Sequence, residues 1–247
     1  MKITYIHHSS FLVELESVYL LFDYTEGTIP GMKREKPLLV LASHRHGDHY
    51  SPVIFDLIKE HGNVRFVLSN DIWRKRLPEE VLPLTDSLKH GETAKYRLEN
   101  GIIRQLTGTP ENQIEDGVIS DACLTIHTYK STDEGVAFLI EAEGKTIYHA
   151  GDLNNWRWEG EPDNWNDSMA KKYSAQIDKM AGMHLDVAFL PLDPRQEDDF
   201  YLGMDEFLHK VDVKHVFPMH CWGDYSVIGK IRALGCSAGY RDRIEEI

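Results

Sequence analysis

Hydrophobic runs of strand length recur along the whole chain and predict most of its elements. Each spans about four to eight residues, which is typical of β-strands. They lie near 2–6, 10–15, 18–23, 38–42, 64–68, 101–107, 122–128, 135–142, 145–149, 186–190 and 213–218. Glu143-Gly144 predicts a tight hairpin turn between two of them. Because the first strands follow one another and the later ones alternate with helices, the pattern predicts an α/β or α+β domain.

Helical patterns are fewer than strand patterns. Ser51-Pro52 is typical of a capped helix start and predicts a helix over 52–60. A longer helix is expected to begin at Asn166 or Asp167 and to end near Gly182. Its apolar face consists of residues at helical spacing, Met169, Tyr173, Ile177 and Met180. Two more helices are expected near 204–210 and 225–234.

The densest chemical signal follows the apolar run 38–42 directly. Residues 43–50 read Ser-His-Arg-His-Gly-Asp-His-Tyr. Residues two apart in an extended segment share a face, so His44 and His46 can converge on one ion. Asp48 and His49, past the bend at Gly47, can turn toward a second ion. Imidazole and carboxylate groups are ordinary ligands of divalent metals, so this segment predicts a metal site.

The motif His-x-His-x-Asp-His resembles the signature of the metallo-β-lactamase superfamily. That resemblance implies a four-layer αβ/βα sandwich in one domain over 1–247, and a bridging aspartate and a last histidine at later strand ends. Asp152 and His220 stand in those places, after the strands 145–149 and 213–218. The opening hairpin, with His7-His8-Ser9-Ser10-Phe11, is similar to the branch that contains ascorbate-6-phosphate lactonase-like hydrolases. His8-Ser9 is a candidate partner that orients a metal ligand.

One element implied by the resemblance is missing. That branch usually carries a further histidine before a glycine-containing strand, and the best register places Lys130 there. A protonated lysine cannot bind a metal. Three interpretations stay open. His127 supplies the ligand through a shifted strand, or Asp48, His49, Asp152 and His220 hold a single ion. In the third, Lys130 pairs with Asp152 or binds an anionic substrate, against the ordinary alternative of a lysine that extends into solvent.

The polar segment from Leu153 to Asp167 is expected to line the pocket. It carries Trp156, Trp158 and Trp165, which either pack the segment onto the protein body or form an apolar wall over the metal. Arg157, between two of these residues, and Arg195, after the strand 186–190, are candidates for binding a carboxylate or phosphate of the substrate.

Composition narrows the class of partner. The chain of 247 residues has 27 Lys and Arg against 40 Asp and Glu, a net charge of −13. An acidic protein whose one basic cluster is 74–76 is a poor nucleic-acid binder. Three scattered cysteines and the absence of a long apolar run predict a cytoplasmic protein that does not enter a membrane.

Metal-assisted hydrolysis of a small molecule is the predicted function, with a lactone, an ester or a phosphoester as substrate. A metal-bound hydroxide would act as nucleophile, and Asp48 would move the proton. One or two divalent ions are expected, zinc first and manganese or iron as alternatives. Two other functions stay open. One is a ligand-binding module that keeps the fold with weak or lost catalysis, and the other is a phosphodiesterase or nuclease.

Overall fold

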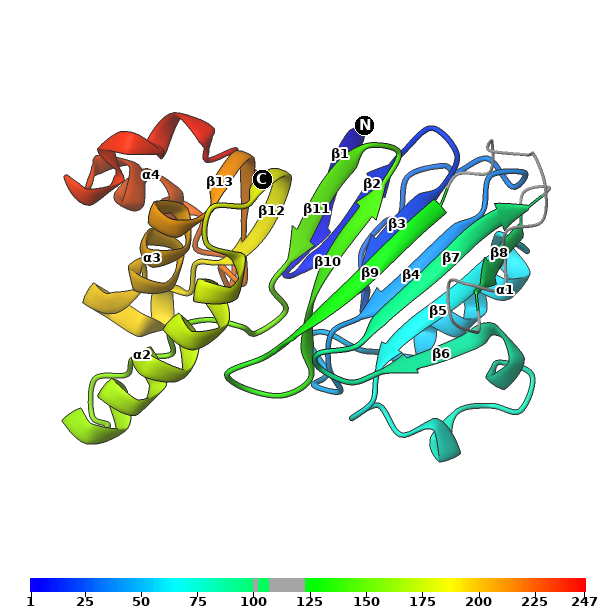
Figure 1. The fold of residues 1–247 in the computed structure, drawn as a ribbon, viewed down its shortest axis with the longest axis horizontal. Coiled ribbons are helices and arrows are strands. Elements are labelled where there is room, and N and C mark those ends of the chain that lie inside the picture. The colour runs from blue at the N-terminus through cyan, green and yellow to red at the C-terminus, as the bar shows by residue number, and fades with distance from the viewer. Residues whose placement is uncertain (100–101, 107–122) are drawn as a thin grey trace.

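Two mixed β-sheets form the centre of the protein in a computed structural model (Figure 1), which describes residues 1–99, 102–106 and 123–247. The first sheet has the order β1-β2-β3-β4-β5-β6. Its strands are β1 (Lys2–His7), β2 (Ser10–Glu14), β3 (Tyr19–Phe22), β4 (Leu38–Ala42), β5 (Val64–Ser69) and β6 (Thr85–Leu88). The strands β1 to β3 are antiparallel, and β3 to β6 run parallel.

The second sheet has the order β13-β12-β11-β10-β9-β7-β8. Its strands are β7 (Thr93–Glu99), β8 (Ile102–Gln105), β9 (Cys123–Lys130), β10 (Val136–Ala142), β11 (Lys145–His149), β12 (His184–Pro191) and β13 (Asp212–Met219). The strands β11, β12 and β13 are parallel to one another. At least ten residues separate each parallel pair along the chain, as crossover connections require.

The alternation of side chains along the first sheet explains how it is covered on both faces. In β2, Phe11 and Val13 belong to the core shared with the second sheet, whereas Leu12 packs on the opposite side. There Ile54 and Leu57 cover the sheet, from a 3-10 turn over Pro52–Asp56 and from α1 (Leu57–Glu60). One strand therefore contributes to two apolar layers.

Three further helices lie beside the edge of the second sheet that β12 and β13 form (Figure 1). They are α2 (Asp163–Ile177), α3 (Leu202–Lys210) and α4 (Ser226–Ala233). Phe207 of α3 stacks on Tyr148 of β11 with ring centroids 5.0 Å apart. Helices thus pack against both sheets, which confirms the predicted αβ/βα sandwich.

The predicted elements agree with the structure except in two regions. The strands β6 and β7 were not predicted, and the ends of the expected strand 101–107 lie outside the described residues. The expected helix start at Asn166 or Asp167 is wrong, because α2 already begins at Asp163 after Pro162. Asn166 lies inside the helix, and its side chain bonds the backbone of Trp158.

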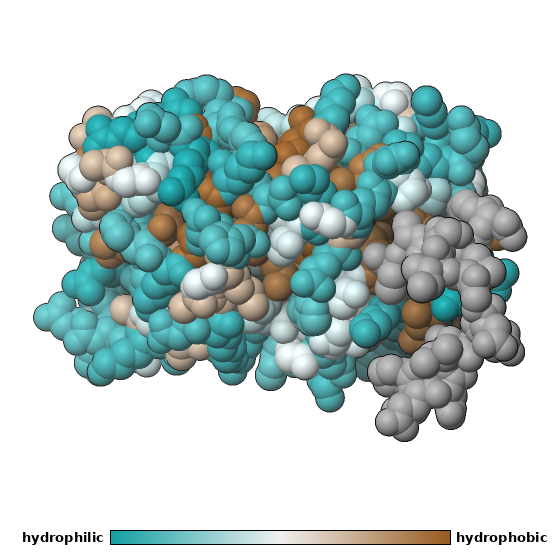
Figure 2. Space-filling view, turned by 45° about the horizontal axis from the view of Figure 1, so that its top comes forward, coloured by the Kyte–Doolittle hydropathy of each residue, from teal (hydrophilic) through white to brown (hydrophobic). Residues whose placement is uncertain are grey.

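Hydrophilic residues cover most of the face seen in Figure 2, and hydrophobic residues show mainly toward its middle. No helix within the described residues combines the length and the apolar composition needed to cross a bilayer.

Candidate metal centre

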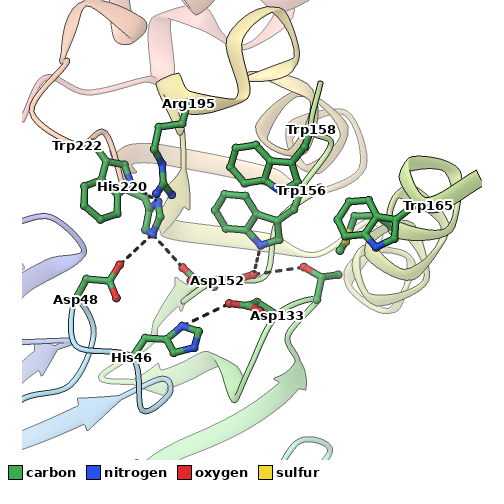
Figure 3. A pocket seen from close by; sticks show the side chains of 12 residues that line it. His46, Asp48, Asp133, Asp152, Trp156, Trp158, Trp165, Arg195, His220 and Trp222 are labelled. Atoms are coloured by element: carbon green, nitrogen blue, oxygen red, sulfur yellow. Dashed lines mark hydrogen bonds and ion pairs between the residues drawn. The ribbon is translucent and has the colours of Figure 1, made fainter. Parts of the chain in front are cut away.

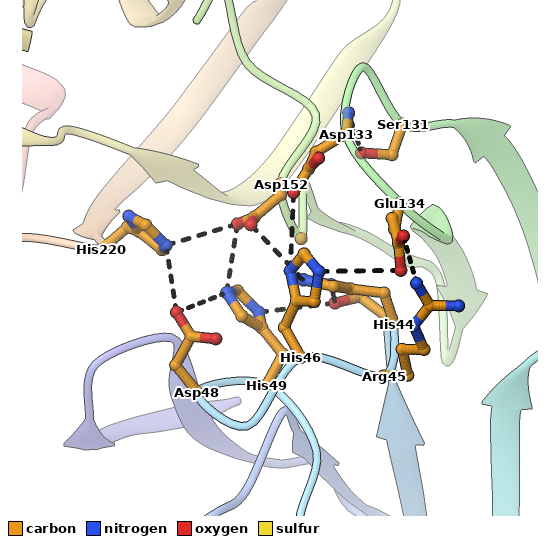
Figure 4. Close-up of polar contacts among 12 residues, drawn as sticks. His44, Arg45, His46, Asp48, His49, Ser131, Asp133, Glu134, Asp152 and His220 are labelled. Carbon is orange, nitrogen blue, oxygen red and sulfur yellow. Dashed lines mark hydrogen bonds and ion pairs between the residues drawn. The ribbon is translucent and has the colours of Figure 1, made fainter. Parts of the chain in front are cut away.

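Five connections meet at one edge of the sandwich and bring the predicted ligands together (Figure 4). The loop after β4 carries the histidine motif, and the ends of β11 and β13 lead to Asp152 and His220. The turn between β9 and β10 and the turn between β1 and β2 complete the group. These last two turns contribute residues that the sequence did not assign as ligands, Asp133 and His8.

The first candidate site contains His44, His46, Asp133 and Asp152, whose ligand atoms all lie within 4.8 Å of one another. The His44 Nε2 is 3.4 Å from an Asp152 oxygen, and the His46 Nδ1 is 3.5 Å from an Asp133 oxygen. Ser43 Oγ lies 3.0 Å from the His44 Nδ1, which leaves the Nε2 of that ring for the site. Two imidazoles and two carboxylates form a set that Zn, Mn or Fe can accept.

The second candidate site contains His8, Asp48, His49 and His220, again within 4.8 Å of one another. The Nε2 atoms of His8 and His220 lie 3.4 and 3.6 Å from the same Asp48 oxygen. Asp152 lies between the two groups, because one of its oxygens is 3.1 Å from the His49 Nε2 and the other faces His44. Asp152 therefore has the position expected of a bridging ligand.

Buried polar atoms without a hydrogen-bond partner converge on this second group. They are the Nε2 atoms of His8, His49 and His220 and the Oδ1 atom of Asp152. A buried polar atom that makes no hydrogen bond is costly, and four of them facing one another need a common partner. A divalent cation would satisfy all four atoms at once, so the donor set fits a metal ion.

Buried carboxylates fix the orientation of two of these imidazoles from behind. Asp23 accepts hydrogen bonds from the Ser43 amide and hydroxyl, at 2.7 and 2.6 Å, and lies 2.7 Å from the His49 Nδ1. Asp193 lies 3.0 Å from the His220 Nδ1. A carboxylate behind a ligating imidazole sets its tautomer and raises its basicity, so both rings present their Nε2 atoms to the site.

Electrostatics at the site follow from this pairing of acids and imidazoles. Burial alone would lower the pKa of His49 and His220, but Asp152 and Asp23 beside His49, and Asp193 and Asp48 beside His220, raise both values. Burial would likewise raise the pKa of Asp152, yet His49 and His44 hold it well below its usual range. The Asp152 carboxylate is thus ionised. A divalent ion would supply the positive charge that faces it, and the imidazoles would then bind that ion as neutral ligands.

Glycine at position 135 brings Asp133 into the site. Gly135 has φ +68°, and a Cβ placed there would lie 2.0 Å from the Ser43 carbonyl oxygen and 2.5 Å from the His44 Cβ. The Val136 amide then donates to the Ser43 carbonyl at 2.9 Å. Because only glycine permits this close approach, the β9–β10 turn packs directly against the histidine loop.

Among the interpretations open for Lys130, the structure agrees with a lysine that extends into solvent and not with a pairing to Asp152. Lys130 is exposed at the end of β9, and no ion pair joins it to Asp152 among the described residues. His127 does not supply the ligand either, because it contacts Thr93 Oγ1 at 3.0 Å and lies 3.6 Å from Glu141. Asp133, three residues beyond Lys130, faces the histidines instead.

A cavity of about 610 Å³ opens beside the candidate ligands (Figure 3). One part of its wall is formed by candidate ligands, namely His46, Asp48, Asp133, Asp152 and His220. The other part is aromatic, with Trp156, Trp158, Trp165 and Trp222. The Trp156 Nε1 donates to the Asp152 backbone carbonyl at 2.9 Å, so the indole and the ligand hold each other in place.

Of the two arginines predicted to bind the substrate, only one lines the cavity. Arg195 lines the cavity, but its guanidinium forms an ion pair with Asp193 and lies over the Trp222 ring at 4.2 Å. Arg157 does not line the cavity and pairs with Asp199 at 3.1 Å. The role expected for Arg157 is therefore corrected, because its charge is used in a surface ion pair.

Similarity to known proteins agrees with this geometry. A family model described as a beta-lactamase superfamily domain matches residues 2–161. The chain belongs to the metallo-β-lactamase superfamily. Within it, a UPF0173 metal-dependent hydrolase of Desulforamulus reducens is 28% identical over 230 residues, covering 89% of this chain and 84% of the relative. One from Thermus thermophilus is 25% identical over 253 residues, 98% of this chain and 92% of the relative.

A solved structure shows the same fold. The metallo hydrolase Igni18 from Ignicoccus hospitalis superposes with a TM-score of 0.59 at 17% identity, covering 99% of this chain and 94% of that one. At this identity the likeness concerns the fold alone, and the roles of individual residues depend on the geometry described above.

Proposed function

We propose that this chain is a metal-dependent hydrolase that cleaves an ester or lactone bond of a small molecule at two adjacent divalent ions. His44, His46, Asp133 and Asp152 would hold one ion, and His8, Asp48, His49 and His220 would hold the other beside Asp152. The observation that carries the proposal is the group of four buried, unpartnered ligand atoms. Relatives named metal-dependent hydrolases support it.

The chemistry comes from the ions and the positioning from the chain. When bound, a divalent cation acidifies a water molecule and polarises a carbonyl group. The substrate carbonyl would lie at the cavity wall formed by His46, Asp48 and Asp152, beside the aromatic wall. Hydrolysis adds the water oxygen to the carbonyl carbon and breaks the acyl–oxygen bond, and the leaving alkoxide takes a proton.

Asp48 is the proposed proton carrier of this reaction. Its side chain is 31% exposed, whereas the Asp152 side chain is 7% exposed, so Asp48 can reach both the ligand group and solvent. Burial would raise the pKa of Asp48, but the His220 and His8 imidazoles beside its carboxylate outweigh that effect and lower it. The carboxylate is therefore ionised at neutral pH, the state that a metal ligand and a proton acceptor both require.

Zinc is the proposed metal, because imidazole-rich sets suit it well. Manganese and iron are the alternatives, and the two carboxylates at the His44–His46 site favour such harder ions more than the His8–His49–His220 site does. The narrower likeness to the ascorbate-6-phosphate lactonase-like branch remains a prediction, and the position of His8 on the opening hairpin supports it.

Hydrolysis of a panel of esters and lactones tests the proposal, with His220→Ala beside the matched variant His184→Ala. His184 is a surface histidine whose side chain is 84% exposed and pairs with Asp212. Chelation should abolish turnover of any substrate found, and Zn²⁺ or Mn²⁺ should restore it. His220→Ala should lower kcat/KM at least 100-fold, and His184→Ala less than twofold. Turnover that survives both chelation and His220→Ala would refute the proposal.

A further inference from the structure

The distribution of tryptophan in this chain is strongly uneven. Four of the five tryptophans line the cavity beside the candidate ligands. Trp156 and Trp158 come from the segment after β11, Trp165 from the first turn of α2, and Trp222 from the loop after β13. Separate parts of the chain thus place indole rings around one space.

Packing of the protein body accounts for only part of this wall. Trp156 is buried, with 6% of its surface exposed, but Trp165 and Trp222 are 38% and 49% exposed. Trp222 also has a left-handed backbone, with φ +49°, which is unfavourable for a bulky side chain. Exposed aromatic surface at the mouth of a cavity is typical of a ligand site.

The aromatic wall is preformed. The Trp156 and Trp158 rings stack at 5.8 Å between centroids and 5° between planes. The Asn166 side chain accepts from the Trp158 amide and donates to its carbonyl, each at 3.0 Å. Rings held in this way lose little freedom when a flat ligand packs against them.

Charge in the cavity disfavours an ionic group at this wall. Arg195 is the only Lys or Arg among the described lining residues, and Asp193 already neutralises it. A carboxylate or phosphate would therefore find no free cation beside the indoles. The Arg195 guanidinium also covers one face of Trp222 and lies 5.8 Å from the Trp158 ring, so a cationic ligand would find the cation–π position on that face of Trp222 already occupied.

We infer that the cavity selects substrates with a neutral, flat aromatic ring, which packs against the Trp158 and Trp165 side while the scissile ester or lactone faces Asp48 and Asp152. The part of this inference that concerns cleavage rests on the proposed function, whereas the binding of the ring does not. Figure 3 shows Trp156, Trp158 and Trp165 on one side of His220 and Asp152, and Trp222 on the other side of His220. Aromatic pairs in offset or edge geometry are favoured beyond the area that they bury.

Binding of two alcohols that differ in aromaticity tests the inference without any hydrolysis. The probes are 2-naphthalenemethanol and its saturated counterpart, decahydro-2-naphthalenemethanol, titrated calorimetrically into the full, metal-loaded chain. The aromatic alcohol should bind about tenfold more tightly, which corresponds to about 1.4 kcal/mol. Equal binding, tighter binding of the saturated alcohol, or no binding of either would overturn the inference.

Substitutions at Trp165 separate stacking from simple apolar contact, and because this residue is exposed we expect the variants to fold. Trp165→Phe should keep the preference for the aromatic alcohol, and Trp165→Leu should reduce it about threefold or more. Trp73→Leu is the matched control, because Trp73 is 44% exposed and lines a different cavity. A preference that Trp165→Leu leaves unchanged, or that Trp73→Leu reduces equally, would contradict the assignment.

A paired substrate comparison then links the ring to turnover. Benzyl acetate and cyclohexylmethyl acetate have alcohol leaving groups of similar basicity, so a higher kcat/KM for the benzyl ester reports ring recognition. If neither ester is hydrolysed but the naphthyl alcohol binds as expected, the proposed reaction fails and the ring site stands. If both are hydrolysed equally and the alcohols bind equally, the reaction stands and the ring site fails.

Discussion

Asp133 is the proposed ligand that distinguishes this candidate metal centre from the one expected from the sequence, so Asp133→Asn is the most informative substitution. The side chain faces His46 at 3.5 Å and belongs to a group of four donors that includes Asp152. An asparagine keeps the shape of the side chain but removes its negative charge and one strong oxygen donor.

Asp133→Asn should weaken the binding of only one of the two ions. Loss of a residue that only orients a ligand typically weakens metal binding 10–100-fold. Asp133 is proposed to be a direct donor, so the loss should be at least 100-fold, or about 2.8 kcal/mol. Because the second group of ligands does not include Asp133, the other ion should bind with its affinity unchanged.

Metal content after equilibrium dialysis, combined with competition against a chromophoric chelator, measures both ions separately. The wild-type chain should hold two ions, and Asp133→Asn should hold one under the same conditions. Lys130→Ala is the control, since this residue is exposed and should leave the content at two. Two tightly bound ions in Asp133→Asn, or loss of one in Lys130→Ala, would refute the assignment.

Three further predictions follow from other contacts. Asp193→Asn removes the negative charge of the acceptor behind the His220 Nδ1 and should weaken metal binding 10–100-fold by chelator competition, whereas a change below twofold would contradict its orienting role. Glu143 accepts from the Glu16 and Ser17 amides, each at 2.7 Å. Burial would raise the pKa of its carboxyl, but the Ser17 hydroxyl, which also donates to it, and these two amides lower it. The stabilisation is therefore present above the carboxyl's ordinary pKa of about 4.3 and is lost as the pH falls through the lower folded value. Because the residue is exposed, Glu143→Gln should reduce the free energy of unfolding by only about 0.5–1 kcal/mol at pH 7 in urea titrations, and by less at pH 3; an equal loss at both pH values would contradict it. Removal of the metal should lower the melting temperature, because an ion at 1,000 times its dissociation constant stabilises the folded state by about 4 kcal/mol; identical melting with and without chelator would argue against a folded-state metal site.

The histidine motif, Asp152 and His220 could be located from the sequence because each follows a strongly apolar strand. Strands that run parallel to their neighbours end at the same edge of a sheet, so residues directly after them come together. The motif after β4 and Asp152 after β11 illustrate this for the two sheets. The convergence of these residues could therefore be predicted from the positions of the strands and the family resemblance.

Asp133 and His8 could not be assigned as ligands in the same way, because turns carry them and tertiary contacts place them. Asp133 reaches the site only because Gly135 lets its turn touch Ser43 and His44. His8 has φ +48°, a left-handed conformation at the end of a short hairpin that no periodicity predicts. The family pattern, aligned residue by residue, predicts a ligand at Lys130, because sequence spacing alone does not show the path of that turn.

The strand β7 was missed although its sequence held a usable signal. Ala94, Tyr96 and Leu98 alternate with polar residues, and the first two are buried in the core. Alternation of this kind is typical of a strand with one buried face, whereas the other strands were recognised as continuous apolar runs. The strand β6 has no comparable pattern, because the buried residues of Thr85–Leu88 include Thr85 and Asp86. Asp86 is held by a bidentate ion pair with Arg65 at 2.7 Å, a contact that depends on the neighbouring strand.

Anomalous diffraction from crystals soaked in Mn²⁺ or Zn²⁺ tests the two-ion centre most directly. The account predicts two peaks on either side of Asp152, one among His44, His46 and Asp133 and the other among His8, Asp48, His49 and His220. A single peak, or ions bound only away from these side chains, would contradict it.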